Sequence, residues 1–199
     1  DTLIYTFKLP ENVSTISGRL NLNIGGFNFY SEYAHKINDP TAMNKYIYKN
    51  GNGLFTTLSY SRKGLGINVS YKVIDNMSYK SNRTVTNNQL DINYLPSLTK
   101  QHSYALAAMY PYATQPNGEY GVAGTITYTI PKNTRLGGKY GTSFSLNFSR
   151  VNSISKDSIP GAYIGETGTV GYKTNFFIPG KETYYQDFNI DMTKKFNKK

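Results

Sequence analysis

Apolar and polar residues alternate along most of the chain, which is the period of a β-strand whose two faces meet different surroundings. Ile126 and Tyr128, for example, fall on one face, while Thr127 between them falls on the other. The clearest alternating runs are 16–24, 65–73, 119–130, 139–150 and 182–194. Weaker runs at 2–8, 27–36, 53–62, 89–94, 102–110 and 162–178 bring the expected number of strands to eleven. No segment has a convincing helical period, so the pattern predicts an all-β protein.

Short and long connections between the predicted strands favour one topology. Gly25-Gly26, Lys63-Gly64 and Pro179-Gly180-Lys181 are typical of tight turns. Longer loops are expected at 37–52, 74–88, 111–118 and 151–161, and intermediate ones at 95–101 and 131–138. A meander with short turns at one end and long loops at the other predicts an antiparallel up-and-down transmembrane β-barrel. A soluble β-sandwich would need Greek-key crossings, and a propeller blade would need twice as many strands in the same length.

Aromatic residues on the apolar face form two tiers, as expected at the two interfaces of a membrane. Barrel strands rise about 3.4 Å per residue and tilt about 40°, so the span from Tyr120 to Tyr128 climbs roughly 21 Å. Tyr140 and Phe148 have the same spacing. The tier expected beside the short turns is Phe27, Tyr60, Tyr94, Tyr104, Tyr128, Tyr140 and Tyr184. The tier expected toward the long loops is Tyr33, Tyr71, Tyr110, Tyr120 and Phe148.

Composition excludes several classes of protein. Only 17% of residues are charged, yet the mean hydropathy is −0.50, because neutral polar residues such as the 21 Asn are abundant. The 19 Tyr and 10 Phe argue against a disordered chain. The absence of cysteine excludes disulfide scaffolds and thiolate metal sites, and His35 and His102 have no spacing typical of a metal pair. No apolar run is long enough for a membrane helix.

Six runs of the sequence are distinctive. They are Ser31-Glu-Tyr-Ala-His-Lys36, Tyr46-Ile-Tyr-Lys-Asn-Gly-Asn-Gly53, Arg62-Lys-Gly-Leu-Gly66, Tyr94-Leu-Pro-Ser-Leu-Thr-Lys-Gln-His102, Tyr110-Pro-Tyr-Ala-Thr-Gln-Pro-Asn-Gly118 and Leu136-Gly-Gly-Lys-Tyr-Gly-Thr142. They resemble an uncharacterised family of Bacteroidota outer-membrane β-barrel proteins, and the resemblance covers most of the chain. It implies an exported barrel in the outer membrane of a Gram-negative bacterium, and it implies no activity. Members of that family are longer, with strands on both sides of the matching region.

The polar faces of the predicted strands carry charged residues that would point into the lumen of a barrel. They are Arg19, Glu32, Lys36, Lys72, Asp91, Lys173, Asp187 and Asp191. Both signs occur, which can produce a transverse field across a water-filled channel. Internal ion pairs, or a lumen plugged by side chains and loops, explain the same residues equally well, because eleven strands do not define a diameter.

The formal net charge of +10 does not predict nucleic-acid binding, because the basic residues are scattered along the chain. Several of them, Lys100 included, are expected at or beside the short turns. There lysine commonly just solvates the turn, and contact with anionic lipid or a periplasmic partner is the functional alternative. No GxSxG elbow, P-loop or EF-hand loop is present, so neither an enzyme nor a cofactor is expected.

These features predict an outer-membrane β-barrel protein that acts as a pore or as a barrel subunit of an envelope complex, with outer-membrane lipid and envelope proteins as partners. The alternative is a soluble, secreted β-rich module that binds glycan or protein through Tyr/Asn-rich loops. Residues 1–199 are expected to form one β-barrel region. Because bacterial single-chain barrels have an even number of strands, eleven strands predict a part of a longer barrel. A missed strand, or closure by another chain, would also restore an even number.

Overall fold

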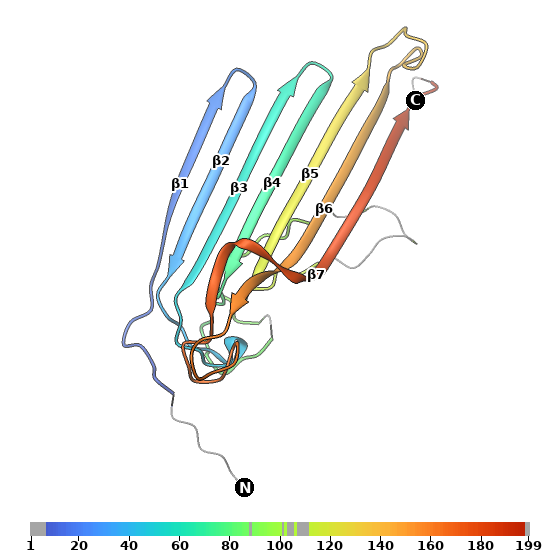
Figure 1. Cartoon of the computed structure of the whole chain (residues 1–199). Helices are drawn as coiled ribbons and strands as arrows, with labels where there is room; N and C mark the ends of the chain where they lie inside the picture. The colour runs from blue at the N-terminus through green and yellow to red at the C-terminus, as the bar shows by residue number, and fades with distance from the viewer. Residues whose placement is uncertain (1–6, 88, 101, 103–105, 107–111, 198–199) are drawn as a thin grey trace.

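Seven β-strands dominate the computed structural model, which describes residues 7–87, 89–100, 102, 106 and 112–197 (Figure 1). The strands are β1 (Thr15–Ile24), β2 (Phe27–Lys36), β3 (Gly51–Arg62), β4 (Leu65–Asp75), β5 (Glu119–Ile130), β6 (Thr142–Asp157) and β7 (Lys173–Lys194). In the part of the chain so described, the helical structure is one 3₁₀ turn, Ala42–Asn44. No helix within these residues is long and apolar enough to cross a membrane.

Each strand pairs antiparallel with the next one in sequence, so the order in the sheet is β1-β2-β3-β4-β5-β6-β7. Short turns at 25–26 and 63–64, and the connection 131–141, lie at one end (Figure 1). The connections 37–50 and 158–172 lie at the other end, where the connection 76–118 also leaves β4 and enters β5. The predicted all-β, antiparallel, sequential arrangement is confirmed. The seven strands form an open sheet with β1 and β7 at its edges, so a closed barrel is not confirmed.

Glycine determines the geometry of the first turn. Gly25 and Gly26 have φ angles of 55° and 88°, which lie in the left-handed region that glycine adopts without strain. A Cβ atom at Gly26 would also lie only 2.8 Å from the backbone oxygen of Ser61. The Gly25-Gly26 pair is therefore needed both to reverse the chain and to let β2 pack beside β3.

The two faces of the sheet differ in chemistry and in exposure. In the register of the strands, Ile24 lies level with Phe27 and Tyr60, and these side chains begin an apolar face that continues to Met192 on β7. This face is uncovered: Ile24 is 73% exposed and Met192 is 63% exposed. The opposite, polar face carries mostly Ser, Thr, Asn and charged residues. The few buried apolar side chains gather near the long loops and include Ile47, Val73, Ile74, Met77, Val151, Ile154 and Tyr172.

The prediction of a strand at 89–94 is wrong. The described residues of this segment form an irregular loop with one isolated bridge between Lys80 and Asp91. Leu90 has a φ of 57°, and this left-handed conformation interrupts an extended run. Lys80 Nζ donates to the backbone oxygen of Asn87 and to Asp91 Oδ1, both at 2.6 Å. A lysine side chain, and not a neighbouring strand, therefore satisfies polar groups of this segment.

The turn expected at Pro179-Gly180-Lys181 is also wrong, because β7 runs without interruption from Lys173 to Lys194. Proline is tolerated there because Pro179 lies in an irregular stretch of the pairing with β6, where the regular ladder is already interrupted. The pairing of β6 with β7 has register shifts between Val151 and Ser155, which absorb the extra residues of β7. The first part of β7 curls out of the plane of the sheet there (Figure 1).

Other expected boundaries also change. β6 extends to Asp157 and does not end at residue 150, and residues 162–172 form a loop. The expected strand 2–8 lies mainly outside the described residues, and so does most of 102–110. The structure thus describes seven strands, and the expectation of eleven is not confirmed.

Candidate functional site

Six of the eight charged residues that were predicted to face a lumen share the polar face of the sheet. They are Arg19, Glu32, Lys36, Lys72, Asp187 and Asp191. Lys173 stands at the start of β7, opposite Asp157 in the register. Asp91 lies in the loop 76–118, since the strand expected around it does not form. The polar face therefore holds the candidate site.

A segment of the long loop, residues 95–100, lies across this polar face, and we call it the strap. Lys72 on β4 holds its first part, because Lys72 Nζ donates to the backbone oxygen of Pro96 at 2.5 Å. Leu98 then lies over Gly121 on β5: a Cβ atom added at Gly121 would be 2.9 Å from Leu98 Cδ1. The absence of a side chain at Gly121 is what lets the strap approach the sheet so closely.

The far end of the strap is held by β7. Lys100 Nζ donates to Asn189 Oδ1 at 3.1 Å and forms an ion pair with Asp191. Beyond the strap, His102 Nε2 lies 2.7 Å from Asp187 Oδ2. Since Asp187, Asn189 and Asp191 alternate along one strand, they present their side chains to the same face. The loop therefore crosses from β4 to β7.

A buried ion pair fixes the base of the loop. Lys72 Nζ lies 2.5 Å from Glu119 Oε1, and neither side chain is exposed. Glu119 Oε2 accepts hydrogen bonds from Tyr112 Oη and from the backbone N–H of Gln115, both at 2.8 Å. Lys72 also donates to Thr114 Oγ1 at 2.8 Å. Burial, together with the nearby Glu119 carboxylate, raises the pKa of Tyr112, so its hydroxyl remains a donor.

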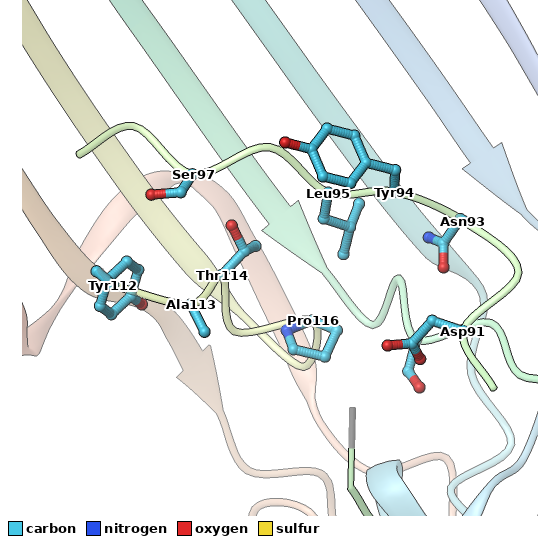
Figure 2. A pocket seen from close by; sticks show the side chains of 10 residues that line it. Asp91, Asn93, Tyr94, Leu95, Ser97, Tyr112, Ala113, Thr114 and Pro116 are labelled. Atoms are coloured by element: carbon cyan, nitrogen blue, oxygen red, sulfur yellow. The ribbon is translucent and has the colours of Figure 1, made fainter. Parts of the chain in front are cut away.

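The strap and the return arm of the loop, residues 112–118, are thus both attached to β4 and β5. Between the two arms is a cavity of about 370 Å³ (Figure 2). In this view the side chain of Leu95 points from the first arm toward the second, where Pro116 lies. The cavity belongs to the loop and not to the sheet.

A second cavity, of about 320 Å³, lies between the strap and the polar face. Hydroxyl and amide groups dominate its polar lining: Asn68, Ser70, Thr125, Asn147 and Ser149 from the strands, with Ser97 and Thr99 from the strap. Lys100 is the charged residue of this lining, and Asp191 pairs with it. The space under the strap can therefore hydrogen-bond a polar guest without presenting an unbalanced charge.

The other long loops are held by a cluster around Asp75, at the end of β4. Tyr172 Oη and Thr174 Oγ1 donate to the Asp75 carboxylate at 2.8 and 2.7 Å, and Lys49 Nζ lies 3.2 Å from it. Lys156 Nζ lies 4.1 Å from the centroid of the Tyr172 ring. Burial, and secondly the Asp75 carboxylate, raise the pKa of Tyr172. This cluster is a structural support for the loop end of the sheet.

Part of the expected aromatic tiers lies on the apolar face as predicted. Phe27 and Tyr60 contact each other beside the short turns, with tilted rings whose centroids are 4.4 Å apart, and Tyr128 lies at the same end. Toward the long loops, Tyr71 and Tyr120 contact each other with centroids 5.3 Å apart. Tyr33 lies at this end as well, whereas Phe148, which was also expected there, lies midway along β6.

Three further members of the expected tiers are placed differently. Tyr184 lies toward the long loops and not the short turns, because the turn expected before it is a bulge at the loop end of β7. Tyr94 also stands in the long loop, where it is 85% exposed. Tyr140 lies at the expected end, but in the connection 131–141 and not on a strand. Tyr104 and Tyr110 lie outside the described residues.

Sequence reasoning missed the strap and two of the residues that attach it. Glu119 did not stand out because its partner, Lys72, is distant in sequence. Lys100 was expected near a short turn, but it lies on the strap, 91 positions from Asp191. An isolated acidic residue at the start of an otherwise neutral strand was the only signal for Glu119. Within the described residues, no group of three or more His, Cys, Asp or Glu side chains is placed to hold a metal ion.

Comparison with known proteins identifies one relationship. A model for a family of unknown function, DUF6029, matches residues 2–199. No curated protein and no solved structure matches the chain. Any function must therefore be argued from the residues and their geometry.

Proposed function

The chain belongs to a family of unknown function, DUF6029, and we propose that it forms part of the wall of a transmembrane β-barrel. The barrel would lie in the outer membrane of a Gram-negative bacterium, of the Bacteroidota lineage that the sequence motifs favour, and would act as a pore. One observation carries this proposal: a continuous apolar face, exposed across all seven strands, lies opposite a polar face. The outside and the inside of a membrane barrel differ in the same way.

Exposure of the apolar face to water would be energetically unfavourable. Burial of apolar surface is worth about 25 cal/mol per Å², and the largest apolar patch on a typical soluble monomer covers about 300–600 Å². Here uncovered side chains include Ile16 on one edge strand and Phe188 on the other. Nothing in the described part of the chain packs over this face. Lipid hydrocarbon is the surrounding that needs no further layer of protein.

The height of the apolar face supports the same proposal. On β5, Tyr120 and Tyr128 flank Val122 and Ile126, and a climb of roughly 21 Å separates the two rings along a tilted strand. The lipid-facing band of outer-membrane barrels is about 25 Å tall, with aromatic residues at both margins. Arg150 lies on this face at the level of Val122, just inside the ring of Tyr120, and its long side chain would extend to the margin toward the long loops.

The edges of the sheet indicate how the wall would close. β1 and β7 run in the same direction, because each of the strands between them reverses the chain. An antiparallel closure therefore needs an odd number of further strands between β7 and β1, which gives an even total. Unpaired strand edges are costly in hydrocarbon, so these further strands are required by the membrane proposal.

The experiment is extraction of the full-length protein from the outer membrane. A barrel is expected to need detergent for solubility and to change its gel mobility on heating. It is expected to produce conductance steps in planar bilayers. Solubility without detergent, with no effect of heating, would overturn the proposal and favour a secreted binding module. A heat-modifiable barrel that copurifies with envelope proteins and never conducts would favour a structural subunit over a pore.

A further inference from the structure

The strap lies on the side of the sheet that, under the proposed function, faces the lumen. It is held at β4 by Lys72, over β5 by contact between Leu98 and Gly121, and at β7 by Lys100. A segment attached at both ends across four strands must project into the interior of any barrel that this sheet helps to form. We infer that the strap is a constriction that admits small, uncharged, hydrogen-bonding solutes more readily than larger ones. The inference rests on the proposed function.

The chemistry under the strap indicates the class of solute. The cavity of about 320 Å³ lies near the lower end of the range of small-molecule sites. The neutral polar groups of its lining donate and accept hydrogen bonds: Thr125 Oγ1 donates to Asn147 Oδ1 at 3.0 Å, and Asn147 Nδ2 donates to Asn189 Oδ1 at 2.9 Å. Such side chains can exchange partners with the hydroxyl groups of a sugar-like molecule as it replaces water.

The charges of the two lysines that hold the strap are balanced. Lys100 pairs with Asp191, and Lys72 pairs with Glu119, so each cation has a carboxylate beside it. An ion that enters a narrow passage loses hydration, and paired charges provide little net field to compensate for that loss. A neutral polyol has no such penalty. The passage should therefore select by size and hydrogen bonding, and it should prefer neither cations nor anions.

The test measures solute entry into vesicles that contain the full-length protein. The wild-type protein is expected to admit glucose readily and raffinose slowly. The variant Asp191→Asn removes the charged partner of Lys100 and leaves the hydrogen bond to Asn189, so raffinose entry should rise severalfold while glucose entry changes little. The matched control Glu11→Gln removes one carboxylate from an exposed position outside the sheet and should leave both rates unchanged.

A disulfide between the strap and β5 tests the effect of fixing the strap, whereas Asp191→Asn tests the effect of loosening it. The chain has no cysteine, so Leu98→Cys with Gly121→Cys introduces the only thiols. A Cβ at residue 121 would lie 3.8 Å from Leu98 Cγ, which places the two sulfur atoms within reach of each other. In the Asp191→Asn background, the oxidised protein should regain slow raffinose entry, and reduction should reverse this effect.

Two results would overturn the constriction. One is a conducting, heat-modifiable barrel whose raffinose rate is the same in wild type, in Asp191→Asn and in the cross-linked protein. The other is a wild-type barrel that admits no sugar at all, which would make the strap a plug. Neither result contradicts the proposal that the chain forms part of a membrane barrel. Failure of the proposed function is recognised separately, because no variant would then need detergent or change its mobility on heating.

Discussion

Lys72 on β4 and Glu119 on β5 form an ion pair with 2.5 Å between Nζ and Oε1, and the protein removes both side chains from solvent. This pair joins the sheet to the loop, because the two residues also bind the strap and the return arm through Pro96, Thr114 and Tyr112. Burial of two charges is costly, and the pair persists because hydrogen bonds satisfy their remaining polar groups.

Glu119→Gln should destabilise the protein by about 3–5 kcal/mol, because it leaves the Lys72 ammonium buried without its counter-charge. The free energy of unfolding in urea, measured for protein folded into vesicles, checks this. The double variant Lys72→Met with Glu119→Gln removes the orphaned charge and should recover part of the loss. A loss below about 1 kcal/mol for the single variant would mean that the pair is hydrated and weak.

Gly121→Val should displace the strap, because its Cβ would already meet Leu98 Cδ1 at 2.9 Å. Overpacking of this kind costs about 1–3 kcal/mol. Displacement of the strap is expected to speed tryptic cleavage after Lys100, and mass spectrometry measures the rate of this cleavage. Gly124→Val is the matched control, since a Cβ at Gly124 would have only Asn68 O within 4 Å, at 3.9 Å. Equal cleavage rates in the two variants would contradict the packing of Leu98 on Gly121.

Leu58 and Thr57 are neighbours on β3 whose side chains point to opposite faces, so they test which face meets lipid. Leu58→Lys should cost about 2–4 kcal/mol if its position lies near the middle of a bilayer, whereas Thr57→Lys should be tolerated. The measurement is again the free energy of unfolding in vesicles. Similar small costs for both lysines would argue that the apolar face does not contact hydrocarbon.

Tyr172→Phe should cost about 1.5–3 kcal/mol, because it removes a hydrogen bond from Tyr172 Oη to the charged Asp75 carboxylate. Tyr163→Phe, at a tyrosine that is mostly exposed, is the control and should have little effect on the free energy of unfolding. A similar cost for both variants would contradict a specific role for the hydroxyl of Tyr172.

The pH dependence follows from the raised pKa of Tyr172. An unfolded tyrosine ionises near pH 10, whereas the buried one keeps its proton, so the folded state binds more protons above that pH. The stabilisation is complete below about pH 10 and is lost as the pH rises further. The free energy of unfolding should therefore fall in alkaline solution, and less steeply in Tyr172→Phe. If the free energy of unfolding fell equally steeply with pH in both proteins, ionisation of Tyr172 would not be the cause of the alkaline loss of stability.

Local sequence patterns were sufficient to predict the strands that have one apolar and one polar face. The alternation around Ile126 and Tyr128 predicted both the strand and the face of each side chain, because a strand repeats every two residues. The same rule failed at 89–94, where Leu90 adopts a left-handed conformation and Lys80 binds the loop. It failed again at Pro179, because a proline in an edge strand resembles a turn when only its neighbours in sequence are considered.

The sequence by itself determined that this protein is an antiparallel β-sheet with an apolar and a polar face, because the period of the side chains is a local property. Only the tertiary structure decided that residues 95–100 lie on the polar face, and that Lys72 meets Glu119 and Lys100 meets Asp191. These contacts join residues far apart in the chain, and their energy depends on burial and on distances that no local pattern encodes.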